Sequence, residues 1–315
     1  MGKDSKIDWT HHTFNPWRGC AKVSEGCKNC YAETSAPVRV SRARGLELWG
    51  AHAHRQIASE AMWREPLRWN REAEQAGERR RVFCASLADV FEDRTPRLGS
   101  GFSDDLREPR QRLWELIRDT PHLDWLLLTK RPENVLRFVP DHWRAHEPGR
   151  GAVDAWPRNV WIGCTVENQD RAQERLPHLL HIPARVRFVS YEPALEAVDF
   201  GPYLPLVFRR GLASPVVLPA RGGVRGIDWI IVGGESGPGA RPFNPAWADR
   251  IVSQCKEARV PVFVKQMGSN PTLRSGSGWG PITDRKGGDW SEWSAQLRVR
   301  QVPEFKQIAQ AQEPG

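Results

Sequence analysis

The sequence predicts an α/β protein in which parallel strands and crossover helices form a full or partial (β/α) barrel. Short apolar runs alternate about six times with longer segments of helical periodicity, which is the pattern of repeated βα units. Polar residues or glycine follow each apolar run, as they do at the mouth of a barrel. Six or seven such units favour a barrel over an open doubly wound sheet.

The expected strands are short runs of apolar, β-branched and aromatic residues. An opening strand is expected around residues 7–14, directly before a cluster of cysteines. The further strands are expected at residues 82–86, 123–129, 160–165, 186–190, 227–232 and 260–264, with a late strand at 297–302. Because parallel neighbours need a crossover connection, helices are expected between them.

The expected crossover helices carry apolar residues three and four positions apart. They lie at residues 104–119, 132–139, 169–180 and 245–258, and one more is expected after Cys30. Three stretches have the Gly-, Pro- or Arg-rich composition of loop insertions, namely 141–158, 201–226 and 269–289. We therefore expect one barrel-like domain over residues 1–303 and a loose tail over 304–315.

Composition and charge restrict the class of protein. With 15 Trp and 11 Phe, the chain is too aromatic to be disordered. Its 46 Lys and Arg outnumber its 38 Asp and Glu, and the net charge of +8 permits a polyanionic partner such as nucleic acid. No apolar run approaches the ~20 residues that cross a bilayer, no apolar signal core follows Met1, and Lys6 breaks the myristoylation pattern. We expect a cytoplasmic protein with no membrane partner.

Three of the six cysteines lie close together, at Cys20, Cys27 and Cys30. Their segment has no periodicity and is expected to be a loop, and a disulfide framework is not expected in a reducing cytoplasm. Three thiolates from one loop can hold three irons of a 4Fe-4S cluster, or they can hold zinc with a fourth ligand from elsewhere. The nearest histidines for a zinc site are His11, His12, His52 and His54. Because these histidines provide no second ligand pair at tight spacing, the pattern favours the cluster.

Charged and polar residues follow the expected strands, and Glu, Lys and Arg are more frequent there than turns require. In a parallel barrel these positions meet on one face. Taken singly, each of them is also explained by a salt bridge or a turn at the mouth of the barrel. The candidate cofactor-binding residues are Ser86, Asp89, Lys130, Arg131, Glu167, Asn168, Glu192, Gly233, Gly234, Glu235, Ser236 and Lys265.

The arrangement of a first strand, a three-cysteine loop and a parallel α/β barrel resembles the radical S-adenosylmethionine (SAM) enzymes. Several strings, which span nearly the whole chain, are also similar to a phage and bacterial family, the phage gene-product thirty-seven/sixty-eight family. The strings are Thr-Phe-Asn-Pro-Trp-Arg-Gly-Cys at 13–20, Cys-Lys-Asn-Cys-Tyr-Ala at 27–32, Leu-Thr-Lys-Arg-Pro at 128–132, Trp-Ile-Gly-Cys-Thr-Val-Glu-Asn at 161–168, Ser-Tyr-Glu-Pro at 190–193, Gly-Gly-Glu-Ser-Gly-Pro-Gly-Ala-Arg-Pro at 233–242 and Lys-Gln-Met-Gly at 265–268. Two features depart from the common radical SAM pattern. The gap between the first two cysteines is longer, and the Gly-Gly-Glu string follows a late strand instead of the second one.

The resemblance implies a 4Fe-4S cluster on Cys20, Cys27 and Cys30, with SAM chelating its open iron through amino and carboxylate groups. An electron donor would reduce the cluster, and reductive cleavage of SAM would yield a 5′-deoxyadenosyl radical that acts on an unknown substrate. Charge and aromatic content make nucleic acid or a nucleotide the first expectation for that substrate. The alternative is a zinc-stabilised, basic nucleic-acid-binding protein without catalysis.

A bound SAM needs an acceptor for its ammonium group, donors for its carboxylate, and polar partners for its ribose and base. The candidates for these three roles are, in that order, Glu192 or Glu235; Lys130, Arg131 or Lys265; and Ser86, Asp89 or Asn168. Gly233, Gly234 and Gly237 are either turn glycines that need a positive φ or a backbone cradle for an anion.

Overall fold

The computed structural model describes residues 2–94, 105–144, 155–208, 216–218, 225–272 and 282–304. Its centre is a parallel sheet of seven strands in the order β1-β4-β5-β6-β7-β10-β11. The strands are β1 (His12–Thr13), β4 (Arg80–Cys84), β5 (Leu123–Thr129), β6 (Val160–Thr165), β7 (Arg187–Tyr191), β10 (Trp229–Gly233) and β11 (Val262–Gln266). The strands expected between residues 82 and 264 are confirmed, whereas the opening strand is limited to two residues.

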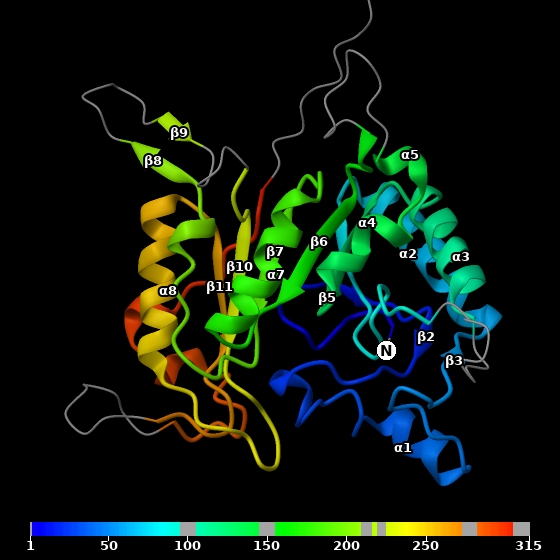
Figure 1. The fold of residues 1–315 in the computed structure, drawn as a ribbon, viewed down its shortest axis with the longest axis horizontal. Coiled ribbons are helices and arrows are strands. Elements are labelled where there is room, and N and C mark those ends of the chain that lie inside the picture. The colour runs from blue at the N-terminus through cyan, green and yellow to red at the C-terminus, as the bar shows by residue number, and fades with distance from the viewer. Residues whose placement is uncertain are drawn as a thin grey trace, which may run out of the picture.

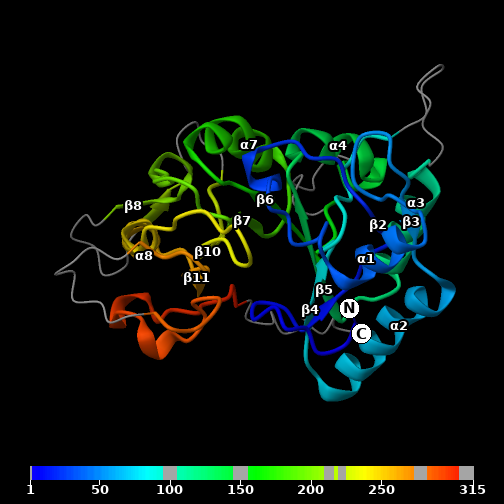
Figure 2. The ribbon, with the colours of Figure 1, turned by 90° about the horizontal axis from the view of Figure 1, so that it is seen from below.

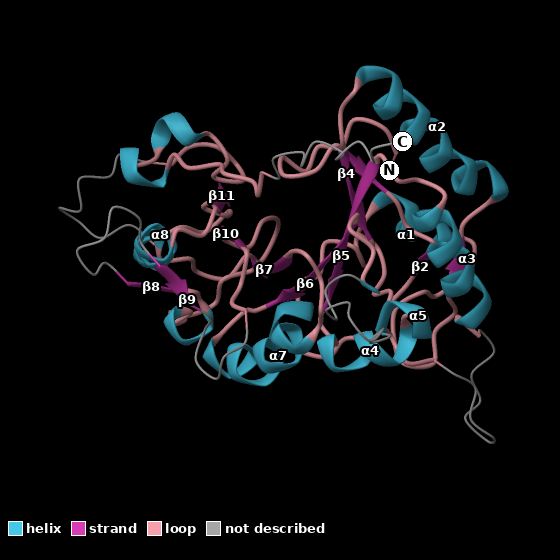
Figure 3. Ribbon diagram, turned by 90° about the horizontal axis from the view of Figure 1, so that it is seen from above, coloured by secondary structure: helices cyan, strands magenta, loops and turns pink. Residues whose placement is uncertain are grey.

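Helices cover the convex side of the sheet, as Figures 1 and 3 show. They are α2 (Glu60–Ala76), α3 (Arg107–Arg118), α4 (Val135–Phe138), α5 (Asp141–Arg144), α7 (Gln169–His181) and α8 (Pro245–Ala258). The helices expected at 104–119, 169–180 and 245–258 are confirmed. The segment at 132–139 is a 3-10 turn, η2 (Pro132–Asn134), that continues into α4.

Two helices precede β4. The one expected after Cys30 is α1 (Ala36–Ala43). Helix α2 was not predicted, because Pro66 and many charged residues hide its apolar stripe. That stripe is nevertheless buried and includes Trp63 and Trp69.

Two short antiparallel pairs lie outside the main sheet. One consists of β2 (Trp17–Arg18) and β3 (Gln56–Ile57), and the other, in the insertion at 201–226, of β8 (Leu206–Phe208) and β9 (Val216–Leu218). Parts of the three expected insertions lie outside the described residues, as does the expected tail apart from Glu304. In the described part of the chain, no helix has the length and apolar character that a bilayer crossing requires.

The two faces of the sheet pack into separate cores, because successive strand residues point to opposite faces. The larger core lies between the sheet and the helices. The concave face carries a second cluster, the aromatic floor, made of Trp9, Phe83, Leu126, Trp161, Val186, Phe188, Trp229, Ile231 and Phe263. Trp229 meets the rings of Trp9 and Trp161 edge-on, with ring centroids 6.2 Å apart in both pairs. Most of its aromatic residues, Trp161, Phe188, Trp229 and Phe263, stand at the first or second position of their strands, whereas Phe83 and Leu126 stand further along theirs.

The sheet is a half-barrel, with β1 and β11 as its two edges. The partial barrel is thus confirmed, and the expectation of a full, TIM-type barrel is wrong. The C-terminal segment covers the edge of β11, where Val264 N donates to Val299 O (2.9 Å) and Gln301 N donates to Val262 O (3.0 Å). The outer edge of β11 therefore pairs with this segment and not with β1.

The late strand expected at 297–302 is also corrected. This segment forms a single antiparallel bridge, between Arg300 and Phe263, and follows the 3-10 turn η5 (Ala295–Leu297).

Candidate metal centre at the mouth of the half-barrel

Residues 20–30, the cysteine loop, lie at the mouth of the half-barrel, where the carboxyl ends of the strands meet. Gly19 forms a parallel bridge with Ala88 and donates its N–H to Leu87 O (2.9 Å), which ties the start of the loop to the segment after β4. The loop contains the 3-10 turn η1 (Glu25–Cys27). In Figure 2 the blue N-terminal segment crosses in front of the strand ends. The cysteine loop therefore lies at the carboxyl ends of the strands, where the functional residues of parallel α/β barrels are found.

Cys20 is held from the end of β5 by Arg131. One guanidinium nitrogen, Nη1, lies 3.8 Å from Cys20 Sγ, and the other, Nη2, donates to Ala21 O at 2.9 Å. The same guanidinium forms an ion pair of 2.8 Å with Asp89. Burial would raise the pKa of Asp89, but Arg131 and a hydrogen bond from Thr129 hold this pKa below its usual range. Burial raises the pKa of Cys20 to about 12, and the charge of Arg131 opposes that rise.

Glu167, just after β6, supports the middle of the cysteine loop. It is fully buried, forms an ion pair of 2.7 Å with Arg175 of α7, and accepts a hydrogen bond from Ser24 Oγ. Gly26 packs so closely on Glu167 that a Cβ there would lie 2.4 Å from its side chain. Cys27 follows directly, with its Sγ 3.8 Å from Ser24 Oγ. In this structure Glu167 faces the loop, and its partners are protein groups.

Glu235, just after β10, supports the end of the cysteine loop. It accepts a hydrogen bond of 3.0 Å from Asn29 Nδ2 and forms an ion pair of 2.6 Å with Arg241. Arg241 Nη1 also donates to Glu25 O at 2.8 Å, so the pair contacts the loop at two places. Burial would raise the pKa of Glu235, but the hydrogen bonds from Arg241 and Asn29 hold it below its usual range.

A further buried ion pair supports the loop, and the sequence reading did not identify it. Glu92 accepts hydrogen bonds from Arg55 Nε (2.8 Å) and Nη2 (2.7 Å), and its Oε1 also accepts from Ala21 N (3.2 Å). Glu92 stands three residues after Asp89, so its position after β4 could have identified it as a candidate strand-end residue. Nothing in the sequence around Arg55 indicates its pairing, because its partner Glu92 is 37 residues away.

Above the aromatic floor, the concave face becomes polar. Lys130, Glu192 and Lys265 each stand two residues beyond an inward-facing strand position, so they face the interior as well. Lys265 Nζ lies 2.9 Å from Glu192 Oε1, and Lys130 Nζ donates to Thr165 Oγ1 at 3.3 Å. Ser190 Oγ donates to Glu192 Oε2 at 3.4 Å. These five side chains form the polar interior.

The two candidate glycines after β10 are explained by close packing. A Cβ at Gly233 would lie 2.8 Å from Glu192 Oε1, and one at Gly234 would lie 2.4 Å from Met267 O. Neither glycine has a positive φ, so the expectation of turn glycines is wrong for these two, whereas Gly237 has a φ of 101° and confirms it. Gly233 instead leaves room for the side chain of Glu192.

The remaining candidates lie around the mouth. Ser86 Oγ accepts a hydrogen bond of 3.0 Å from Asn15 Nδ2, and Ser86 O accepts one of 3.0 Å from Tyr31 Oη. Asn168 is the N-cap of α7 and accepts a hydrogen bond from Arg171 N. Ser236 is partly exposed beside Glu235. Tyr31, which the sequence reading left outside the candidate set, is 56% exposed and directly follows Cys30.

The donor chemistry of the cysteine loop fits a metal centre. Cys20, Cys27 and Cys30 are free thiols, and thiolates are the donors that both iron-sulfur clusters and zinc use. Among the residues that the structure describes, no three His, Cys, Asp or Glu side chains are close enough together to hold a metal ion. Metal binding at this loop therefore requires the three thiols to come together.

The histidines considered for zinc fall into two groups. His11 and His12 line a charged pocket with Glu72, Glu78 and Arg80 near the amino end of β4, away from the cysteine loop. His52 and His54 belong to the segment before β3. That segment lies beside the loop, because Cys20 forms a bridge with Trp49.

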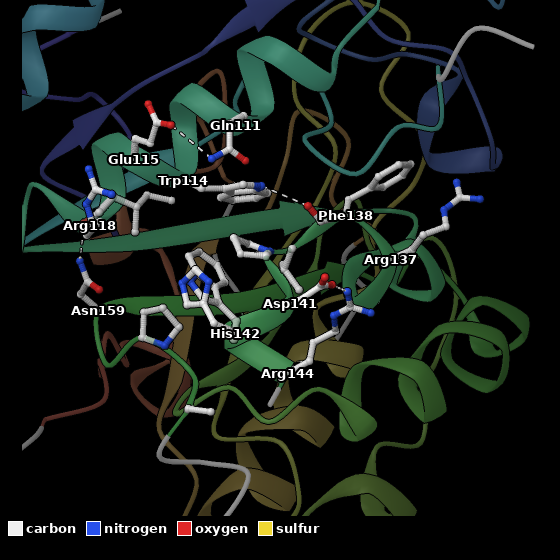
Figure 4. Close-up of a pocket in the computed structure, with 16 residues that line it drawn as sticks. Gln111, Trp114, Glu115, Arg118, Arg137, Phe138, Asp141, His142, Arg144 and Asn159 are labelled. Carbon is white, nitrogen blue, oxygen red and sulfur yellow. Dashed lines mark hydrogen bonds and ion pairs between the residues drawn. The ribbon is translucent and has the colours of Figure 1, made fainter. Parts of the chain in front are cut away.

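A cavity of about 760 Å³ lies outside the half-barrel, between α3 and residues 137–144. Figure 4 shows Trp114 and Gln111 of α3 on one side of it and Phe138 and His142 on the other. None of the candidate cofactor-binding residues lines this cavity. It is separate from the mouth of the half-barrel.

By its geometry this protein is an α/β half-barrel that carries a three-thiol loop at the carboxyl ends of its parallel strands. The chain belongs to the family described as protein of unknown function (DUF5131), whose model matches residues 4–300. This match does not confirm the named phage family that the sequence strings resemble. No curated protein matches the sequence.

Solved structures of spore photoproduct lyase show a weak similarity to this chain. The lyase in complex with a dinucleoside spore photoproduct has 10% sequence identity and a TM-score of 0.39, covering 82% of this chain and 65% of the lyase chain. A cysteine-to-serine mutant of the lyase has 13% identity and a TM-score of 0.39, covering 61% of this chain. In that comparison the chain spans about half of the lyase, 48%. Similarity at this level assigns no activity to this chain.

Proposed function

We propose that this protein is a radical-SAM-type iron-sulfur enzyme that holds a 4Fe-4S cluster on Cys20, Cys27 and Cys30. One observation carries the proposal: three free thiols lie on a single loop that buried strand-end ion pairs hold at the mouth of a parallel half-barrel. When bound, such a cluster supplies the electron that cleaves SAM to methionine and a 5′-deoxyadenosyl radical.

The strand-end residues divide into two groups in this proposal. Asp89, Arg131, Glu167 and Glu235 already have protein partners on or beside the cysteine loop, so they position the loop. The polar interior is left for SAM. This division narrows the candidates for SAM binding.

The polar interior has the charges that the amino acid end of SAM needs. Glu192 accepts hydrogen bonds from the ammonium group, and Lys130 and Lys265 donate to the carboxylate. The side chain of Lys265 is 26% exposed, so its ammonium group is accessible to a ligand that enters from solvent. The lack of a side chain at Gly233 accommodates Glu192, because a Cβ there would lie 2.8 Å from Glu192 Oε1.

A nucleotide or nucleic acid is the substrate class that we propose. The net charge of +8 supports a polyanionic partner. The buried tryptophans, such as Trp9, Trp69 and Trp229, cannot stack on bases, whereas Trp290 is 44% exposed. Tyr31 is a better stacking platform, because it is exposed next to Cys30 and its hydroxyl group is fixed on Ser86 O.

The test is release of 5′-deoxyadenosine from SAM by protein that has been reconstituted with iron and sulfide without oxygen and reduced with dithionite. We expect the wild-type protein to release it and the Cys27→Ala variant to fall to the background rate. Cys255→Ala is the matched control, because Cys255 is a buried cysteine of α8 outside the loop. Iron-loaded wild-type protein that leaves SAM intact would refute the proposed reaction. Full activity of Cys27→Ala would refute the proposed ligands.

A further inference from the structure

Arg131 and Arg241 hold the cysteine loop in the same way, with one difference. Each forms an ion pair with a strand-end carboxylate, at 2.8 Å for Arg131 and 2.6 Å for Arg241. Each also donates to a backbone carbonyl of the loop, at 2.9 Å and 2.8 Å respectively. Arg131 in addition places its Nη1 3.8 Å from Cys20 Sγ, within hydrogen-bonding distance of a sulfur.

The guanidinium of Arg131 is held in a fixed orientation. Its partner Asp89 accepts hydrogen bonds from Thr129 Oγ1 (2.7 Å), Phe91 N (3.0 Å) and Lys130 N (3.1 Å). Asp89 is 5% exposed and Arg131 is 8% exposed, so water screens their charges little. A guanidinium held in this way keeps one N–H directed at the sulfur of Cys20.

Hydrogen bonds to ligand sulfurs and nearby positive charge change the reduction potential of an iron-sulfur cluster. Reduction adds a negative charge, part of which resides on the ligand sulfurs. A donor that carries a full positive charge stabilises that state more than the oxidised one. It therefore makes the cluster easier to reduce.

We propose that Arg131 is a positioning residue that orients Cys20 and raises the reduction potential of the cluster through its sulfur, and that Asp89 orients Arg131. This inference rests on the proposed function, because it requires the cluster. It gives Arg131 a role different from the SAM carboxylate donor expected from the sequence. Arg241 holds the loop without touching a sulfur and serves as the comparison.

The experiment compares two double variants with the wild-type protein, each reconstituted without oxygen. Asp89→Asn with Arg131→Met removes every side-chain N–H donor at position 131 and leaves no unpaired buried charge. Glu235→Gln with Arg241→Met is the matched control, because it removes an equivalent ion pair elsewhere on the loop. Iron per chain and the midpoint potential, from an optical redox titration, are measured for all three proteins.

We expect the Asp89/Arg131 variant to bind iron with a more negative midpoint potential, and the Glu235/Arg241 variant to keep the wild-type potential. Equal potentials in all three proteins, or equal shifts in both variants, would overturn the inference and leave the proposed function standing. Iron-free wild-type protein would overturn the proposed function itself. If the double variant does not fold, Arg131→Lys keeps the charge but loses the fork geometry, and we expect a smaller shift of the same sign. An unshifted Arg131→Lys potential would then overturn the inference.

Discussion

His12 of β1 is 1% exposed, and its two ring nitrogens have no hydrogen-bond partner among the described residues. Its ring stacks on Trp69, with ring centroids 4.5 Å apart. Burial and the charges of His11 and Arg80 lower the pKa of His12 to about 4, against the opposing charges of Asp4 and Glu72. The histidine is therefore neutral in the folded protein at pH values where the unfolded chain already binds a proton.

This difference predicts a loss of stability in acid. Between about pH 6.5 and pH 4 the unfolded state binds more protons than the folded state, so the free energy of unfolding falls as the pH falls. The loss reaches up to about 3 kcal/mol. His12→Phe keeps a ring against Trp69 and reduces this pH dependence in urea unfolding curves, whereas His11, whose pKa burial also lowers, retains its own part.

The exposed His178 of α7 provides the control, and His178→Gln is expected to keep the wild-type pH dependence. If His12→Phe had the same pH dependence as the wild-type protein, the assignment to His12 would be wrong.

The sequence could identify which residues stand at strand ends, but it could not identify their partners. Lys130 and Glu192 face the interior as a parallel sheet requires. Arg131 and Glu167 turn to the cysteine loop, where their partners Cys20 and Ser24 lie 111 and 143 residues away. Such pairings depend on the complete fold, because residues this far apart in the sequence leave no local sequence pattern that predicts their contact.

Among the elements, the cysteine loop depends on close packing at Gly26. A Cβ there would lie 2.4 Å from Glu167, which is buried and held by Arg175 and so has no room to shift. We predict that Gly26→Ala displaces the turn before Cys27 and reduces the iron content of reconstituted protein to less than half, with the far-UV circular dichroism unchanged.

Gly288→Ala is the control for this substitution. A Cβ at Gly288 would make an ordinary contact of 3.5 Å with an Asp284 carboxylate oxygen. We expect it to keep the wild-type iron content. Equal iron content in both variants would show that the packing of Gly26 on Glu167 does not position Cys27.

The central strands were predictable because they are buried on both faces and appear as continuous apolar runs. Apolar and polar residues alternate at 297–302, and this pattern led to the wrong prediction of a strand. A segment that covers a sheet edge through a single bridge can show the same alternation. Helix α2 was missed because Pro66 interrupts a pattern whose buried stripe is set by tertiary packing.

At the scale of the whole molecule, the number of strand-helix units did not determine whether the sheet closes. Closure depends on which segment pairs with the edge of β11, and Val299 and Gln301 pair there. The aromatic floor covers the concave face of the strands, and the polar interior lies at their carboxyl ends, where Lys265 Nζ is 2.9 Å from Glu192 Oε1.

The most direct test of the proposed metal centre is the iron, sulfide and zinc content of protein purified and reconstituted without oxygen. We predict about four irons and four sulfides per chain, with a large loss of both in Cys27→Ala. One zinc and no iron per chain would contradict the proposed cluster, and would mean that the loop is a zinc site of a basic binding protein.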